Sequence, residues 1–129
     1  MYAIGAVAQN LDVVNELLDR GADVNEPTLT GLTPLLLATR KEHSGIVRLL
    51  LARGAHIATR FPEDLNSSLH YACMQANDKI LQILLHHCTK ELSEEQLQET
   101  LYLPNRDGKT ALDLARDLVD TEPANETRK

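Results

Sequence analysis

The 129 residues suffice for one domain, and the 43% that are hydrophobic are mostly Leu, Ala, Val and Ile, a composition typical of packed helices. Only 3% of the residues are aromatic, which argues against stacking platforms for single-stranded nucleic acid and against aromatic-lined ligand pockets. The net charge is −6, and all of the acidic excess falls in residues 61–129, so the basic stripe that a nucleic-acid partner requires is not expected.

One stretch of sequence recurs along the chain. Residues 10–24, NLDVVNELLDRGADV, return as residues 43–57, HSGIVRLLLARGAHI, after a shift of 33 positions. The apolar stripe of this stretch returns once more after 34 further positions, from Ile80 to Leu85. Apolar residues at this spacing predict a helix in each copy, and the fixed shift predicts a repeat architecture.

The ends of these three helices are expected near Arg20, Arg53 and His87. Gly21 and Gly54 follow the first two and supply the left-handed residue that commonly ends a helix. In the third copy Cys88 stands where the glycine would be, in what we interpret as a polar turn.

The segments between these helices also repeat. Each contains a hydroxyl residue directly before an apolar run, namely Thr33, Ser67 and Thr110. A hydroxyl oxygen at that position accepts hydrogen bonds from the free N–H groups of the first helical turn, and Pro34 suits the position that follows. We therefore expect a helix to start at each of these residues and to end before the next polar break, near His43 or Asn77.

A period of 33 with Thr-Pro-Leu at 33–35 and Leu-Leu-x-x-Gly-Ala at 50–55 resembles the ankyrin repeat family. The resemblance extends from residue 1 to about residue 118, apart from one insertion. It implies an all-α, ankyrin-repeat solenoid of stacked helix-turn-helix units, with projecting turn or hairpin loops and a concave side that binds other proteins. The His that the family usually places fourth in its Thr-Pro-Leu-His turn is present only as His70, so weaker hydrogen bonding between repeats is expected at Leu36 and Asp113.

The resemblance predicts one ankyrin-repeat domain over residues 1–121, followed by a flexible tail at 122–129. Its repeats are expected at residues 1–29, 30–62, 63–88 and 104–121, with a helical insertion at 89–103. The apolar residues 1–8 lack a positively charged segment, so we expect them to be folded protein rather than a signal peptide.

The insertion has its own helix signals. Ser93 and Gln96 are spaced as a capping box, and Leu97 and Leu101 lie four residues apart behind them. A short helix is therefore expected here. Its acidic residues are expected to face solvent, and they are Glu91, Glu94, Glu95 and Glu99.

No motif for catalysis is evident. Residues 108–110, Gly-Lys-Thr, match the end of a phosphate-binding loop, but Leu103 occupies the position of its first glycine, so we interpret them as a turn into the Thr110 cap. His70 is interpreted as bonding the backbone of its turn rather than acting as a general base. We expect no enzyme activity, no cofactor and no small-molecule substrate.

The cysteines and histidines show no paired metal-ligand spacing. Adjacent His86 and His87 point about 100° apart on a helix, so zinc binding with Cys73 or Cys88 is not expected. The two cysteines also lack a disulfide signature, which favours a reducing compartment. No apolar run approaches the ~18 residues that span a bilayer. A cytoplasmic or nuclear protein without membrane insertion is therefore expected.

The tips of the finger loops and the exposed face of each first helix are not needed for folding, and we expect a protein partner to bind there. The candidate residues are Leu29, Thr30, Leu32, Arg40 and Lys41 in unit two. In unit three they are Arg60, Phe61, Glu63, Asp64, Asn66, Met74 and Gln75. In unit four they are Arg106, Asp107 and Lys109.

Leu29, Leu32 and Phe61 are large apolar residues in turns, which suit the centre of an interface. The alternative, that Phe61 and Leu29 fold back onto neighbouring fingers, stays open at this point. The basic residues of unit two and the acidic Glu63 and Asp64 of unit three also predict a change in the sign of charge along the strip.

The sequence thus predicts a non-catalytic protein–protein interaction module, with no nucleic-acid partner. The alternative is a targeting or regulatory ankyrin domain of a larger multidomain enzyme or effector. Nothing within these residues separates the two.

Overall fold

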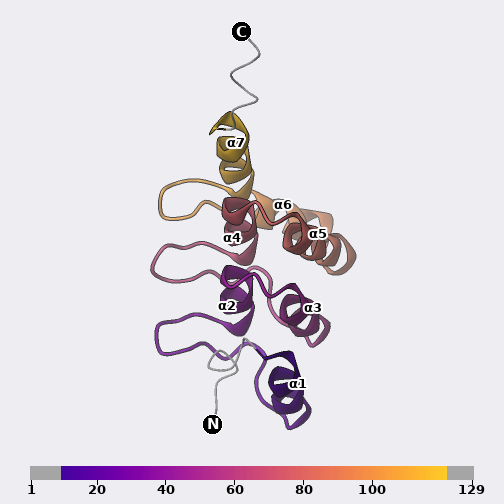
Figure 1. Cartoon of the computed structure of the whole chain (residues 1–129). Helices are drawn as coiled ribbons and strands as arrows, with labels where there is room; N and C mark the ends of the chain where they lie inside the picture. Colours follow the sequence, from indigo (N-terminus) through magenta and orange to yellow (C-terminus); the bar gives the residue numbers. More distant parts are fainter. Residues whose placement is uncertain (1–9, 122–129) are drawn as a thin grey trace.

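The computed structural model describes residues 10–121, which fold into a stack of helix pairs (Figure 1). The helices are α1 (Leu11–Asp19), α2 (Pro34–Arg40), α3 (Ser44–Ala52), α4 (Ser68–Gln75), α5 (Asp78–Glu91), α6 (Glu94–Leu101) and α7 (Ala111–Thr121). Within these residues the ladder hydrogen bonding of β structure is confined to one isolated bridge, between Arg60 and Ser67. The all-α prediction is confirmed.

Two columns of helices make up the stack. Helices α2, α4 and α7 follow one another in one column, and α1, α3 and α5 form the second column beside it (Figure 1). Three loops project from the side of the α2, α4 and α7 column, and we call them the first, second and third finger. Helix α6 lies beside α5. Neighbouring units therefore contact each other through like helices, as expected for a repeat solenoid.

The first helix of each unit starts where the hydroxyl residues predict. The side-chain oxygens of Thr33, Ser67 and Thr110 accept hydrogen bonds from the backbone N–H three residues later, at 3.3, 3.5 and 3.1 Å. Asn10 and Asn77 cap α1 and α5 in the same way. Each cap satisfies a backbone donor that would otherwise lack a partner within its helix.

The ends of the second helices differ between units. Gly21 and Gly54 follow α1 and α3 and both have φ of +94°, as predicted. Helix α5 instead continues through Cys88 to Glu91, so placing Cys88 in a polar turn was wrong. No glycine ends the helix there, and the thiol lies four residues after Leu84 on the buried stripe, where it is 0% exposed.

One apolar core extends through the stack. It includes Val14 of α1, Leu50 of α3, Leu69 of α4 and Leu84 of α5, all of which are fully buried. A smaller cluster of Leu36, Phe61 and Tyr71, with Leu32 packed against it, lies apart from this core.

The insertion forms the expected helix. Ser93 and Gln96 make a reciprocal capping box, with the Gln96 N–H 3.2 Å from Ser93 Oγ and the Ser93 N–H 3.1 Å from Gln96 Oε1. Leu97 and Leu101 are half-buried against the main core. The acidic residues are exposed, as predicted: Glu91, Glu94, Glu95 and Glu99. The expectations for residues 1–8 and 122–129 lie outside the described residues.

His70 joins two neighbouring units. Its Nδ1 accepts a hydrogen bond from the Ser67 N–H at 3.0 Å, and its Nε2 lies 3.1 Å from the carbonyl oxygen of Lys109 in the next unit. The neutral ring with its hydrogen on Nε2 satisfies both contacts, because Nδ1 can accept only when it carries no hydrogen. The interpretation of His70 as a backbone-bonding residue is thus confirmed.

The two residues that replace this histidine behave differently. The Leu36 side chain packs with Phe61 and Tyr71. The Asp113 carboxylate accepts a hydrogen bond from the Thr110 N–H of its own turn, at 3.1 Å. The apolar Leu36 does not repeat the bond that His70 makes to the next unit, as the sequence predicts. Within residues 10–121 no unit follows that of Asp113, so the expectation for this residue stays a prediction.

The stability of the chain is expected to fall in mild acid because of His70. Burial penalises the charged ring and lowers the pKa of His70 below 6.5. As the pH falls below about 6.5, the unfolded chain takes up a proton that the folded chain does not, so the stability present above this pH is lost. We expect the urea midpoint of the wild type to drop between about pH 7.5 and about pH 5.5.

The matched variant is His70→Gln. A glutamine amide can keep the capping box, as Gln96 does with Ser93, but does not titrate in this range. The midpoint of the variant is therefore expected to fall less over the same interval. Equal falls for the two proteins would contradict the role given to His70.

Candidate protein-interaction surface

The first finger ends in a tight turn. The Thr28 N–H donates to the Leu32 carbonyl at 2.8 Å, and the Gly31 N–H donates to the Thr28 carbonyl at 2.9 Å. Gly31 has φ of +96°, and a Cβ there would lie 2.9 Å from the Pro62 ring of the second finger. Only glycine fits this position, because both the backbone angle and the close approach exclude a side chain. The turn presents Leu29 to solvent, with a relative exposure of 108%.

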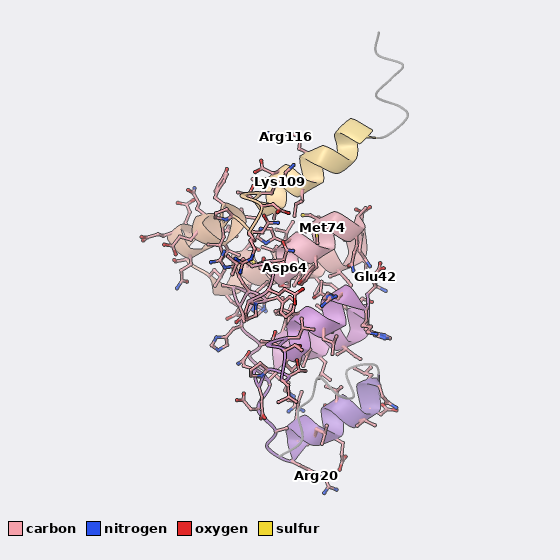
Figure 2. The ribbon with its side chains drawn as sticks, turned by 90° about the vertical axis from the view of Figure 1, so that its left-hand side faces the viewer. Arg20, Glu42, Asp64, Met74, Lys109 and Arg116 are labelled. Carbon is pink, nitrogen blue, oxygen red and sulfur yellow. The ribbon has the colours of Figure 1, made fainter. Side chains whose placement is uncertain are left out.

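The second and third fingers are bound together by arginines. Arg106 donates from its backbone N, Nε and Nη2 to the three carbonyls of residues 62–64, at distances of 2.7 to 2.9 Å. Arg60 donates in the opposite direction, from Nη1 to the Pro104 carbonyl at 2.7 Å. Figure 2 views the stack from the finger side and labels Asp64 and Lys109, which belong to these two fingers. These two fingers therefore form one continuous surface.

A cluster of five residues lies between the second finger and the ends of α2 and α4. The guanidinium carbon of Arg40 is 5.5 Å from the centre of the Tyr71 ring and 5.8 Å from that of Phe61. The Tyr71 hydroxyl donates to the Asp64 carboxylate at 3.0 Å. The Gln75 Nε2 donates to the Arg40 carbonyl at 2.8 Å. We call these five residues the Arg40 cluster.

The charged groups of the Arg40 cluster leave the Arg40 guanidinium available for an ion pair with another molecule. Burial raises the pKa of the Tyr71 hydroxyl, and the hydrogen bond to Asp64 adds to this effect, so the hydroxyl stays protonated and donates. Asp64 is thereby engaged by Tyr71 rather than by Arg40. The Arg40 side chain is exposed and forms no ion pair or side-chain hydrogen bond with another residue of 10–121.

The structure brings some of the predicted residues together and buries others. Arg40, Phe61, Asp64 and Gln75 meet in the Arg40 cluster, whereas Leu29 stands apart on its turn. The exposed predicted residues are Leu29, Thr30, Arg40, Lys41, Glu63, Met74, Arg106 and Asp107. The half-buried ones are Leu32, Arg60, Asp64, Gln75 and Lys109.

Two predicted residues present little surface. Phe61 is only 7% exposed and packs with Leu36 and Tyr71, so the structure favours the alternative in which it folds back. Asn66 is 6% exposed and accepts a hydrogen bond from Asn105 Nδ2 at 2.8 Å, which links two fingers. The apolar residue at the centre of an interface is therefore expected at another position on this face.

The predicted change in the sign of charge along the strip stays a prediction, with Arg40 and Lys41 at the end of α2 and Glu63 and Asp64 in the second finger. Arg40 lies over the ring of Tyr71 and Asp64 accepts a hydrogen bond from its hydroxyl, so both charged residues contact Tyr71. Sequence reasoning missed Tyr71. A signal was present, because Tyr71 occupies the position at which the neighbouring units carry Leu37 and Leu114.

Metal and thiol chemistry find no support in the described part of the chain. No group of three or more His, Cys, Asp or Glu side chains within residues 10–121 is placed to hold a metal ion. Cys73 and Cys88 are free and buried, and burial raises the pKa of both thiols, that of Cys88 to about 11. Neither thiol ionises at neutral pH, so neither has the character of a nucleophile.

Stacked helix pairs with joined finger loops define a helical repeat solenoid, a class of protein that binds partners on extended surfaces. The family model of ankyrin repeats, in three copies, matches residues 1–96, and the chain belongs to the ankyrin repeat family. Ankyrin repeats are generally protein–protein interaction modules without catalytic activity. Within residues 10–121, none of the helices is long and apolar enough to cross a bilayer.

The chain is similar to parts of several longer proteins. The putative ankyrin repeat protein FPV031 of fowlpox virus is 39% identical over 79 residues, which are 60% of this chain and 23% of that protein. Human ankyrin repeat and KH domain-containing protein 1 is 36% identical over 76 residues, which are 58% of this chain and 3% of that protein.

A third relative is matched over a longer part of the chain. Ankyrin repeat, SAM and basic leucine zipper domain-containing protein 1 of Pongo abelii is 32% identical over 107 residues, which are 78% of this chain and 22% of that protein. The chain thus spans less than a quarter of the length of each of these three relatives.

Proposed function

We propose that this chain binds a segment of a partner protein across its fingers and first helices, with Arg40 as the central contact. The observation that carries the proposal is the exposed guanidinium, which lies over two aromatic rings while the nearby Asp64 carboxylate is engaged by Tyr71. An ordered arginine that forms no ion pair within residues 10–121 is suited to bind a carboxylate of a partner protein.

The surroundings of Arg40 favour tight contact. Cations within about 6 Å of a ring centre are attracted to the ring face, so the two rings limit the positions that the guanidinium samples. A side chain that is already ordered loses less entropy on binding. The end of α4 meets the end of α2 through the bond from Gln75 to the Arg40 carbonyl, and there Met74 is 39% exposed. Methionine adapts to varied apolar side chains.

The partner segment is therefore expected to carry an acidic residue for Arg40 and an aliphatic residue near it for Met74. Peptides displayed on phage and selected on the full chain should be enriched in this pair. Binding of the selected peptides to Arg40→Ala should weaken about tenfold or more, because arginines at the centre of an interface are frequent hot spots. Fluorescence anisotropy of labelled peptides measures the loss.

Two further variants sharpen this experiment. Arg40→Lys keeps the charge but loses the planar fork, so it should also weaken binding if the contact to the carboxylate is bidentate. Lys41→Ala removes a neighbouring exposed charge and should change the affinity much less. Selected peptides that lack acidic residues, or that bind Arg40→Ala as tightly as the wild type, would show that Arg40 is not the central contact.

A second proposal concerns the protein as a whole. Two of the three named relatives, human ankyrin repeat and KH domain-containing protein 1 and the Pongo abelii protein, combine ankyrin repeats with other domains, and the chain corresponds to only a small part of each. This favours a targeting or regulatory ankyrin domain within a larger protein. An antibody raised against residues 10–121 should then detect an endogenous protein much heavier than 14.3 kDa on a denaturing gel.

The cellular location of the protein and the boundaries of its domain and repeats are also proposals. The two free, buried thiols support an intracellular location, where thiols remain reduced. We retain one domain over residues 1–121, with the repeat boundaries and the insertion at 89–103 given above. The continuous core through α1, α3, α4 and α5 supports a single domain.

A further inference from the structure

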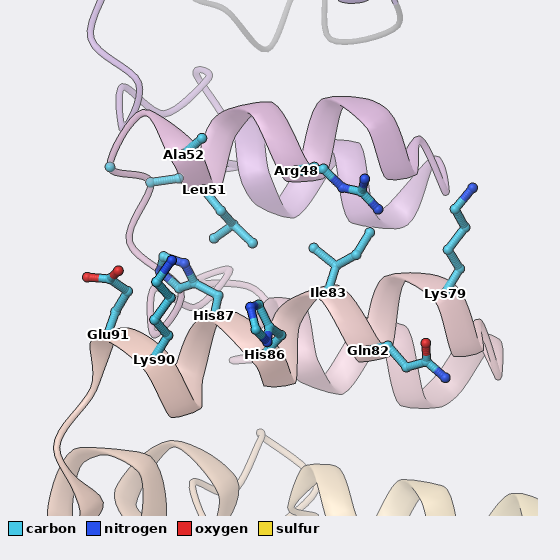
Figure 3. A pocket seen from close by; sticks show the side chains of 12 residues that line it. Arg48, Leu51, Ala52, Lys79, Gln82, Ile83, His86, His87, Lys90 and Glu91 are labelled. Carbon is cyan, nitrogen blue, oxygen red and sulfur yellow. The ribbon is translucent and has the colours of Figure 1, made fainter.

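A groove lies on the side of the stack formed by the second column of helices. It lies between α3 and α5 and has a volume of about 1150 Å³ (Figure 3). Leu51 of α3 and Ile83 of α5 lie in its middle, with Lys79 towards one end and Lys90 towards the other. The residues of the Arg40 cluster do not line it. We call it the α3–α5 groove.

The charge of the α3–α5 groove is opposite to that of the whole chain. Its charged lining residues are Arg48, Lys79, Lys90 and Glu91, and His86 and His87 also line it. The lining thus contains three Lys and Arg side chains and only one carboxylate, although the net charge of the whole protein is −6. Within residues 10–121, none of these three cations forms an ion pair or a side-chain hydrogen bond. The groove therefore concentrates positive charge that the fold itself does not use.

The shape of the groove restricts what can fill it. Its two walls are the helices α3 and α5, whose backbone groups are bonded internally, and the N–H groups of Gly54 and Ala55, which also line it, donate to carbonyls of α3. The groove therefore has no strand edge to pair with an extended peptide. An occupant must then satisfy its own backbone groups, which a helix does. The volume also exceeds the roughly 300 to 1000 Å³ that is usual for small-molecule sites.

We propose that the α3–α5 groove binds an acidic amphipathic helix of a partner protein. Charge complementarity selects the acidic face, and the half-buried Ile83 receives an aliphatic side chain between the carboxylates, whereas Leu51 is only 6% exposed and belongs to the main core. Lys79 and Lys90 are separated by eleven positions on α5, which corresponds to about 16 Å along the helix axis. The carboxylates of the partner helix are therefore spaced about three turns apart. This site lies apart from the Arg40 cluster and does not depend on the function proposed for it.

A long polyanion fits these observations less well. The acidic surface of the rest of the chain repels an extended phosphate backbone, whereas a short acidic helix meets only the groove. The aliphatic centre of the groove offers nothing to a phosphate group. A second copy of this chain could present the glutamates of α6, and this possibility is an outcome of the test.

The probe is a synthetic helical peptide of about five turns, with two glutamates eleven positions apart on one face and a leucine on the same face, seven positions after the first glutamate. Its binding to the full chain is followed by fluorescence anisotropy at low salt. A peptide with lysines in place of the glutamates should not bind, and one with serine in place of the leucine should bind more weakly. The double variant Lys79→Glu, Lys90→Glu should weaken binding of the first peptide at least about tenfold.

The matched control is the double variant Arg20→Glu, Arg116→Glu, which makes the same change in charge at exposed positions that belong neither to the groove nor to the Arg40 cluster. It should change the affinity by less than about threefold at the same salt concentration. Circular dichroism of both variants reports whether they remain folded. All four substituted side chains are exposed, so folding should persist.

Several outcomes would overturn the proposal. Equal loss of affinity in the two double variants would show that only the overall charge matters. Tighter binding of a single-stranded RNA oligonucleotide or of anionic phospholipid vesicles than of the peptide, lost in Lys79→Glu, Lys90→Glu, would assign the groove to that ligand instead. A concentration-dependent dimer that the same variant abolishes would assign it to a second copy of the chain.

Discussion

The substitution Leu50→Ala is expected to lower the free energy of unfolding by about 2 to 5 kcal/mol. Leu50 lies in the middle of α3, is 0% exposed and belongs to the core that joins the units. Removing its branched end loses apolar burial and leaves a cavity that the surrounding helices fill only in part. Urea unfolding at an unchanged m-value measures the loss.

The control for this prediction is Leu29→Ala. It removes the same atoms from a side chain that is 108% exposed on the turn of the first finger. The free energy of unfolding should then change by no more than about 0.5 kcal/mol. If the two variants have the same urea midpoint, the register of the buried stripe in α3 is wrong.

The parts of the fold that the sequence predicts well are those that depend on local chemistry. A hydroxyl before an apolar run at Thr33, Ser67 or Thr110 caps a helix whatever surrounds it, because donor and acceptor are three residues apart. Gly21 and Gly54 end their helices for a similarly local reason, a positive φ. The repeat period then fixes which helices are neighbours.

The parts that the sequence does not predict arise between units. The burial of Phe61 depends on Leu36 from the preceding unit and on Tyr71 further along the chain. The position of Arg40 over Tyr71 depends on the stacking of α2 and α4, and the α3–α5 groove depends on the spacing of two helices from different units. The spacing of residues along the sequence contains no information on distances between units. The candidate residues could therefore be named, but which of them lie close together could not be predicted.

The unexpected length of α5 illustrates the same limit. The absence of a glycine at Cys88 removes a stop signal, but whether a helix continues depends on what its next turn can bury. Here Cys88 enters the core and Leu92 packs against it, which stabilises the additional turn. The helix therefore extends into the segment assigned to the insertion.

Removal of the insertion is expected to abolish or severely weaken folding. Deleting the ten residues from Leu92 to Leu101 restores the period of 33 between Ser67 and Thr110. A solenoid that needs only its repeats would tolerate this change. Leu92, Leu97 and Leu101, however, pack against the main core, and Thr100 is only 4% exposed. Fully burying one leucine contributes about 1.5 to 3 kcal/mol, and these three are half-buried, so losing them costs about 2 to 5 kcal/mol, a large part of the roughly 5 to 15 kcal/mol that stabilises a domain.

Point substitutions separate the packing of α6 from the geometry of the deletion. Leu97→Ala should lower the free energy of unfolding by about 1 to 3 kcal/mol, because the side chain is half-buried rather than fully buried. Gln98→Ala, at the adjacent exposed position of the same helix, should change it by less than about 0.5 kcal/mol. Urea unfolding followed by circular dichroism measures both. A deletion variant that unfolds at the wild-type midpoint, or equal midpoints for Leu97→Ala and Gln98→Ala, would show that the insertion only decorates the surface.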